Sequence, residues 1–156
     1  MKRWTIKELY SKKPVGETVI VKGWLRSQRK AKTFNFMVLN DGSTQSDLQI
    51  IADAELANYE EFNKCNTGSS FAITGEVVES KGKQPIEIIA KEVEIYGTTG
   101  EDYPLQKKGT SMEFLREISH LRPRTNTFGA VFRIRHNLAL ATHKFFDEKG
   151  FFYVNT

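Results

Sequence analysis

A cluster of cations followed by two aromatic residues is the part of the sequence best suited to bind a ligand. Phe34 and Phe36 are two positions apart, so in a strand they share one face. Cations attract phosphates and aromatic rings stack on bases, an arrangement typical of sites for single-stranded nucleic acid. The alternative is an ordinary strand with a solvated face. The cations that precede the aromatic pair are Lys22, Arg26, Arg29, Lys30 and Lys32.

Charge is distributed unevenly along the chain. Residues 1–32 carry ten Lys/Arg and two Asp/Glu, residues 33–102 carry four and thirteen, and residues 103–156 carry nine and four. Two basic regions therefore flank an acidic one, although the formal net charge is only +4. This segregation favours a polyanionic partner that touches two separate basic surfaces. The acidic centre argues against a protein that coats nucleic acid indiscriminately.

Several other kinds of site find no support in the sequence. The three histidines are not grouped with carboxylates at metal-ligand spacing, so we expect no metal site. Phosphate-loop and nucleophile-elbow motifs are absent, and no complete active site is predicted. No apolar run reaches about 18 residues, so no membrane-spanning segment is expected. The one cysteine, Cys65, cannot form an internal disulfide; we expect a small buried side chain and a reducing compartment.

Hydrophobic alternation and turn residues predict a barrel in residues 1–97. A short helix begins at Thr5 as N-cap, with Glu8 three positions on. A second helix at 54–64, capped by Asp53, separates the third and fourth strands. The strand order β-β-β-α-β-β is that of the OB-fold, a five-stranded barrel, so we expect a mainly β domain. The strands are expected at residues 18–26, with a bulge or bend at Gly23, and at residues 33–39, 46–52, 70–79 and 86–96.

The sequence changes in character after the barrel. Residues 98–126 are rich in turn residues and are interpreted as a linker or hinge. Residues 127–156 predict a long helix capped by Thr127 and ended by Gly150 at its C′ position, then a strand at 151–154. A helix and a strand without a sheet to join suggest an incomplete domain, so we expect a fragment of a longer protein. An apolar stripe interpreted as core runs along the helix through Val131, Ile134, Leu138, Ala141 and Phe145.

Strings in this C-terminal part resemble class II aminoacyl-tRNA synthetases. Residues 114–128, FLREISHLRPRTNTF, resemble the start of the catalytic domain of asparaginyl-tRNA synthetases, as does YPLQKK at 103–108. Residues 145–156, FFDEKGFFYVNT, are similar to class II motif 1. Residues 18–96 resemble the anticodon-binding OB domain shared by the asparaginyl, aspartyl and lysyl enzymes. The resemblance implies an anticodon-binding barrel followed by the start of a catalytic domain.

The same resemblance implies roles for individual residues. Phe36 matches the aromatic residue on which the central uracil of the anticodon stacks, and Arg29 matches an arginine that contacts that uracil and the backbone. Gln49 matches the glutamine that reads the first anticodon base, a guanine. Glu87 matches a carboxylate that helps to read anticodon bases. Backbone or accessory contacts would come from Lys30, Lys32 and Phe34.

For the complete enzyme, the resemblance implies attachment of asparagine to tRNA-Asn, which has a GUU anticodon, with ATP and Mg²⁺ in the cytoplasm. This chain lacks motifs 2 and 3, so we expect it to bind tRNA without catalysis and without a cofactor of its own. Two alternatives stay open: part of an aspartyl-type or non-discriminating enzyme, and a stand-alone OB protein for single strands, which leaves the 114–128 string unexplained. A homodimer interface would involve Val131, Ile134, Leu138, Phe145 and Gly150.

Overall fold

The computed structural model describes residues 2–106 and 109–155. Lys107 and Lys108 of the 103–108 string, and Thr156 of the motif 1 string, lie outside the described residues. The chain divides into two compact units, Met1–Thr110 and Ser111–Thr156. Each unit is described by itself below.

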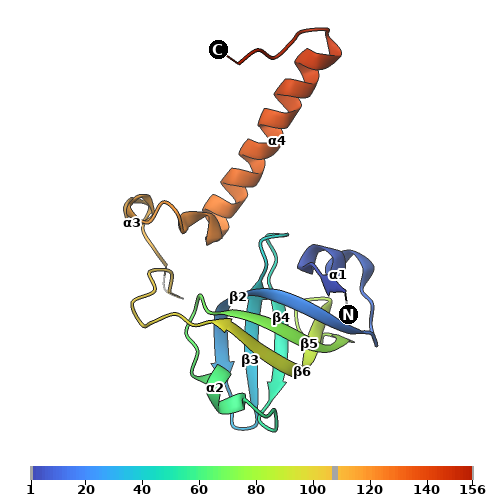
Figure 1. The fold of residues 1–156 in the computed structure, drawn as a ribbon, viewed down its shortest axis with the longest axis vertical. Coiled ribbons are helices and arrows are strands. Elements are labelled where there is room, and N and C mark those ends of the chain that lie inside the picture. Colours follow the sequence, from blue (N-terminus) through green and yellow to red (C-terminus); the bar gives the residue numbers. More distant parts are fainter. Residues whose placement is uncertain (1, 107–108, 156) are drawn as a thin grey trace. The chain divides into compact units, whose positions relative to one another are not determined.

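The first unit is a closed β-barrel (Figure 1). Over the described residues the strand order is β1-β2-β3-β4-β6-β5, and β2 also pairs with β5 to close the barrel. The five long strands and their order confirm the predicted OB-fold, whereas the two-residue β1, parallel to β2, was not predicted. The elements are β1 (Arg3–Trp4), α1 (Ile6–Lys12), β2 (Thr18–Lys30), β3 (Phe34–Asn40), β4 (Leu48–Asp53), α2 (Tyr59–Asn63), β5 (Ser70–Glu79) and β6 (Ile86–Gly97).

Strand β2 bends so that it can pair with two different strands. Its first half, up to Trp24, is antiparallel to β5, and its second half is antiparallel to β3. The register shift lies between Leu25 and Ser27, so a bulge at Gly23 is wrong, whereas the alternative of a bend agrees with the change of partner strand at Trp24. Gly23 instead permits a close approach, because a Cβ there would lie 2.7 Å from the carbonyl oxygen of Asn40.

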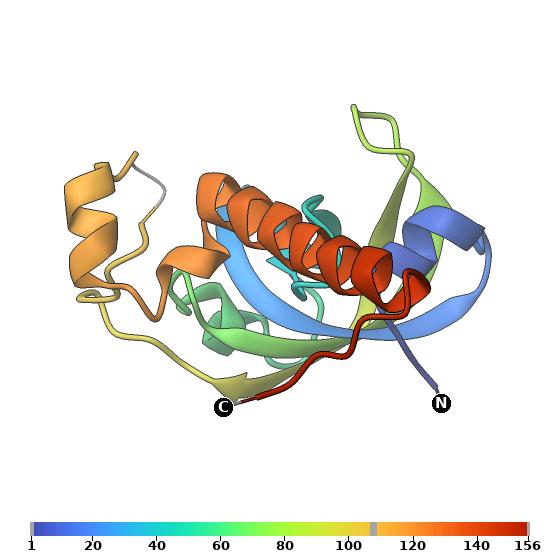
Figure 2. The same ribbon diagram turned by 90° about the horizontal axis from the view of Figure 1, so that it is seen from above.

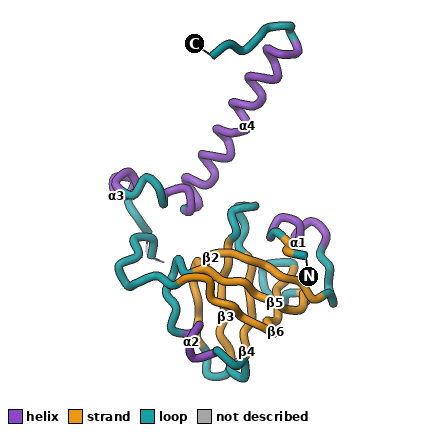
Figure 3. The backbone as a smooth tube through the Cα atoms, in the orientation of Figure 1, coloured by secondary structure: helices purple, strands orange, loops and turns teal. Residues whose placement is uncertain are grey.

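Alternate residues of each strand point into the barrel and form its core. In β3, Asn35, Met37 and Leu39 are buried while Phe36 and Val38 between them stay partly exposed. This division follows from the two-residue period of a strand. The ends of the barrel are covered by Ile6 and Leu9 from α1 and by Tyr59 and Phe62 from α2, and Figure 3 shows the strands curving around this interior.

Helix α1 begins with the predicted capping box. Glu8 Oε2 accepts hydrogen bonds from Thr5 N at 2.9 Å and from Thr5 Oγ1 at 2.8 Å, and these bonds lower the pKa of Glu8. Two further N–H groups are satisfied from the β3–β4 connection: Ile6 N donates to Asp41 Oδ2 at 2.9 Å, and Lys7 N to Ser43 Oγ at 3.0 Å. The helix is therefore fixed to the barrel from its first turn.

Helix α2 is shorter than predicted. It begins after Asn58 rather than at residue 54, and Asp53 does not cap it. Asp53 ends β4, where its Oδ1 accepts from Glu55 N at 2.9 Å and forms a local turn. Cys65, just beyond α2, is buried as expected, and burial raises the pKa of its thiol.

The second unit contains α3 (Met112–Glu117), a 3-10 helix at Arg122–Arg124 and the long helix α4 (Asn126–Glu148). The N-cap of α4 is Thr125, not Thr127: Thr125 Oγ1 accepts from Phe128 N at 3.4 Å. Gly150 has a φ of +81°, as the predicted C′ position requires. No described helix is long and apolar enough to cross a membrane.

Two expectations for this second unit are wrong. Residues 151–155 form no strand, since they pair with no described strand and a ladder needs a partner. The stripe on α4 is not core within this chain, because Val131, Ile134, Leu138 and Phe145 are all exposed, Leu138 to 62%.

The close approach at Gly23 yields a stability prediction. We expect Gly23→Ala to lower the free energy of unfolding by about 1–3 kcal/mol, because the new methyl group must displace the backbone of Asn40. Urea unfolding followed by far-UV circular dichroism measures this change. Gly109→Ala is the matched control, since a Cβ at that position meets nothing within 4 Å. Equal stability of the two variants would show that β2 does not depend on this close approach.

Candidate nucleic-acid interface

The outward-facing residues of β2 and β3 bring a cation onto an aromatic ring. Arg29 pairs directly with Phe36 in the antiparallel register, so both side chains lie on one face. The guanidinium carbon of Arg29 lies 4.8 Å from the centroid of the Phe36 ring. Phe36 in turn pairs with Ile51 of β4, which extends the apolar part of this face. An aromatic ring offers a stacking surface for a base, and the cation over it offers a charge for the phosphate.

A hydrogen-bonded polar pair lies on the neighbouring strands of the same outer surface. Gln49 Nε2 on β4 donates to Glu87 Oε2 on β6 at 2.9 Å. Ser80 Oγ donates to the same carboxylate oxygen at 3.3 Å, and Glu87 is only 8% exposed. The Gln49 side chain is thereby oriented, and its amide oxygen remains an acceptor for a base N–H donor.

The backbone of Gln49 is held by residues that the sequence did not single out. Gln84 Oε1 accepts from Gln49 N at 3.2 Å and lies 3.5 Å from the Tyr10 hydroxyl. That hydroxyl also donates to the carbonyl oxygen of Asp47, and burial followed by the charge of Asp47 raises the pKa of Tyr10 to about 12. Helix α1 is thus connected to the strand that carries Gln49.

A buried amide network supports the other half of the face. Asn35 lies between the two phenylalanines but points inward and is fully buried. Its Nδ2 donates to Gln28 Oε1 at 2.7 Å and to Asn63 Oδ1 at 3.0 Å, while Gln28 Nε2 donates to the Cys65 carbonyl at 2.7 Å. The hairpin with Arg29 and Phe36 is therefore tied to α2. An asparagine at an inward position of an alternating strand was the available signal for this network.

The five cations of the sequence cluster have different surroundings and do not form one continuous surface with Phe36. Lys22 lies over the ring of Tyr96, and Arg26 lies 3.9 Å from Asp47. Lys30 pairs with Asn35 and so leaves β2 on the opposite face from Phe36, whereas Lys32 lies in the connection that follows. Both lysines are exposed and form no ion pair with a described residue. Phe34, at 39% exposure, lies at the hairpin end of the Phe36 face.

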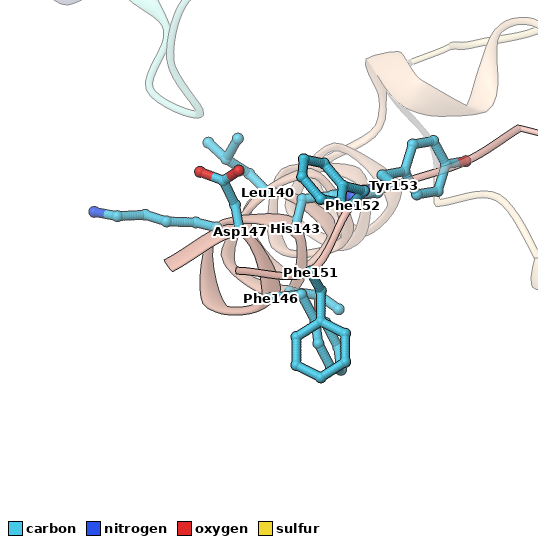
Figure 4. A pocket seen from close by; sticks show the side chains of 9 residues that line it. Leu140, His143, Phe146, Asp147, Phe151, Phe152 and Tyr153 are labelled. Atoms are coloured by element: carbon cyan, nitrogen blue, oxygen red, sulfur yellow. The ribbon is translucent and has the colours of Figure 1, made fainter. Parts of the chain in front are cut away.

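The second unit offers a cavity of different character. A volume of about 750 Å³ lies where the tail folds back on the last turns of α4 (Figure 4). His143 packs on Tyr153 at 4.7 Å and Phe146 on Phe151 at 5.6 Å between ring centroids. The cavity is mostly apolar, so it does not resemble a phosphate-binding surface. Among residues 2–106 and 109–155 no group of three His, Cys, Asp or Glu side chains could hold a metal ion.

Comparison with known proteins identifies the barrel. The family model described as OB-fold nucleic acid binding domain matches residues 19–96, which is half of the chain. The asparagine–tRNA ligase of Bacteroides fragilis is 54% identical over 157 residues, which cover 99% of this chain. The chain spans about a third of the length of that relative.

Solved structures share the fold at lower identity. The asparaginyl-tRNA synthetase of Pyrococcus horikoshii matches 99% of this chain with a TM-score of 0.86 and 19% identity, over 37% of its own length. A putative aspartyl-tRNA synthetase from Leishmania major matches 99% with a TM-score of 0.84 and 20% identity, over 34% of its length. The fold is therefore common to proteins of both names.

The contact between α1 and the Gln49 strand predicts a change in alkaline stability. The raised pKa means that the unfolded chain ionises Tyr10 first, near pH 10, so stability falls between about pH 10 and 12. Tyr10→Phe removes this dependence but costs about 0.5–1.5 kcal/mol at neutral pH through the lost hydrogen bond to Asp47. Urea unfolding at several pH values compares the two proteins. Parallel pH profiles would mean that Tyr10 ionises equally in both states.

Proposed function

Because the chain belongs to the family of OB-fold nucleic acid binding domains, we propose that it is the anticodon-binding part of an asparagine–tRNA ligase. One observation supports this most strongly. The outer face that carries the Arg29–Phe36 stack and the Gln49–Glu87 pair belongs to a chain that is 54% identical, nearly end to end, to such a ligase.

The two halves of the face have different tasks in this proposal. The central uracil stacks on Phe36, and Arg29 turns from the ring to contact that base and its phosphate. Gln49 presents its amide oxygen to the first anticodon base, a guanine that offers N1–H and N2–H₂ donors. Glu87 orients Gln49 and accepts from base N–H groups. Phe34, Lys30 and Lys32 supply accessory and backbone contacts at the hairpin end.

We infer that the complete protein joins asparagine to tRNA-Asn, which carries a GUU anticodon, in the cytoplasm. In that enzyme, ATP and Mg²⁺ would activate the amino acid at a site formed by other parts of the protein. Residues 1–97 form the anticodon-binding domain, residues 98–126 the hinge, and residues 127–156 the start of the catalytic domain. A homodimer interface on α4 is supported by the exposed side chains of Val131, Ile134, Leu138 and Phe145, with Gly150 ending the helix.

An aspartyl-type or non-discriminating enzyme is the second candidate. It is supported by the equally similar fold of the putative aspartyl-tRNA synthetase from Leishmania major. The GUU and GUC anticodons differ only at the third base, so the face around Phe36 and Gln49 suits both. A stand-alone OB protein is less well supported, because the relatives match the second unit as well as the barrel.

The stacking role of Phe36 is tested by its removal. We expect Phe36→Ala to weaken binding of GUU and GUC anticodon stem-loops by about 1–3 kcal/mol each, because stacking tolerates different neighbouring bases. Fluorescence anisotropy with labelled stem-loops measures the affinity, and thermal unfolding checks the fold. Val15→Ala, which truncates an exposed apolar side chain in the α1–β2 connection away from this face, is the control. Unchanged affinity in a folded Phe36→Ala protein would remove this ring from the site.

Gln49 and the hairpin lysines are expected to affect binding in different ways. Gln49→Ala should reduce discrimination between guanine and adenine at the first anticodon position by about 1–3 kcal/mol, by analogy with base-edge contacts in DNA. Lys30→Gln and Lys32→Gln should weaken all sequences alike and make the salt dependence shallower. Binding curves at two salt concentrations separate these effects.

Each of these roles has its own contrary result. Equal losses for guanine and adenine on Gln49→Ala would refute base reading by Gln49. An unchanged salt slope would refute phosphate contact by the substituted lysine. Because Lys30 leaves its strand on the face opposite Phe36, comparison with Lys32 shows which side of the hairpin the RNA backbone follows.

A further inference from the structure

Residues 2–13 carry a second cluster of positive charge, which lies outside the proposed anticodon face. The one carboxylate of this segment, Glu8, is engaged in the capping box of α1. None of the cations forms an ion pair with a described residue; Lys12 lies instead over the ring of Trp4, 5.3 Å from its centroid. These exposed cations, named here the N-terminal patch, are Lys2, Arg3, Lys7, Lys12 and Lys13.

The N-terminal patch lies at one end of the proposed anticodon face. Tyr10 of α1 contacts the Asp47 carbonyl and Gln84, and Gln84 also holds the backbone of Gln49. The turn that contains Gln84 adds the exposed Lys81 and Lys83. Figures 1 and 2 both show α1 beside the end of the β5–β6 hairpin, where this turn lies. The cations of α1 and of this turn therefore lie just past the end of the face that carries Gln49, with the carboxylates of Asp41 and Asp47 between them and the face.

The helix is also presented rigidly. The first turn of α1 is hydrogen-bonded to Asp41 and Ser43. Two of the helix's own side chains, Ile6 and Leu9, are buried in the core of the barrel. Side chains on a fixed scaffold lose less freedom on binding than those of a mobile tail. OB folds contact about 4–16 nucleotides, so reading three anticodon bases leaves room for flanking nucleotides.

We propose that the N-terminal patch binds phosphates of the same RNA outside the anticodon triplet. This inference rests on the proposed function, because it assumes that an RNA strand crosses Phe36 and Gln49 and then continues along the N-terminal patch. The competing explanation is a solvated basic surface that binds nothing. The two explanations differ in the salt dependence of RNA binding, since each phosphate neutralised adds about 0.7–0.9 to the slope of log K against log salt.

The test compares two double variants of the 156-residue chain. Lys7→Gln/Lys12→Gln removes two charges of the patch. Lys91→Gln/Lys144→Gln removes two charges that are already paired, with Glu76 at 3.0 Å and Glu148 at 3.7 Å. Binding of a GUU anticodon stem-loop is measured from about 50 to 200 mM salt, a range in which phosphate contacts change affinity strongly. Binding of the GUU trinucleotide is measured by chemical-shift titration at low salt.

We expect the patch variant to lose about 1–2 from the salt slope for the stem-loop, whereas the control keeps the wild-type slope. Trinucleotide binding should be equal in all three proteins. Lys7→Gln alone should lose about half of that amount. This variant keeps the contact of Lys12 with Trp4, so it separates the loss of charge from a loss of folding.

Two results would overturn the inference while leaving the proposed function intact: a patch variant with the control's salt slope, or equal weakening of trinucleotide and stem-loop binding. Failure of the wild-type protein to bind the stem-loop would refute the proposed function itself, and this inference with it.

Discussion

Strand β2 pairs with β5 along its first half and with β3 along its second half, and this double pairing closes the barrel. It requires a bend, which the bulge after Leu25 and the close approach at Gly23 together allow. Closure gives each of the five long strands a partner on both sides and leaves only the short β1 at an edge. Alternate side chains of every long strand then point into one interior. The side chains left outside β3 and β4 are then available for a ligand.

The outer face combines two kinds of contact on a rigid support. In the proposed function, stacking on Phe36 and the charge of Arg29 provide binding energy that depends little on sequence, whereas the Gln49 amide provides discrimination. Each half is held from the interior or the rim: Gln28, Asn35 and Asn63 fix the hairpin, and Gln84 and Tyr10 fix the backbone of Gln49. The Arg29 guanidinium lies over the Phe36 ring in this structure, so the proposed function requires a base to share that ring with the guanidinium or to displace it.

Long alternating strands were predictable because side-chain parity decides which residues can be buried. The capping box at Thr5 was predictable because it is a local motif. The resemblance named Gln49 and Glu87 separately, and the hydrogen bond between them came only from the structure. Short or competing local features were not predictable. Asp53 could cap a helix or close a turn, and Thr125 and Thr127 could each begin α4. The stripe on α4 shows the further limit that periodicity identifies an apolar face but not the partner that covers it.

The most direct test of the account is a titration of the 156-residue chain with three anticodon stem-loops that share one stem. Two carry GUU and GUC, and the third carries an unrelated triplet without the central uracil or first guanine. If the Phe36 and Gln49 face reads the anticodon, GUU and GUC bind at least about tenfold more tightly than the unrelated loop, as one good base contact requires. Equal affinity for all three loops would contradict anticodon reading and would leave a barrel that binds RNA by charge and stacking alone.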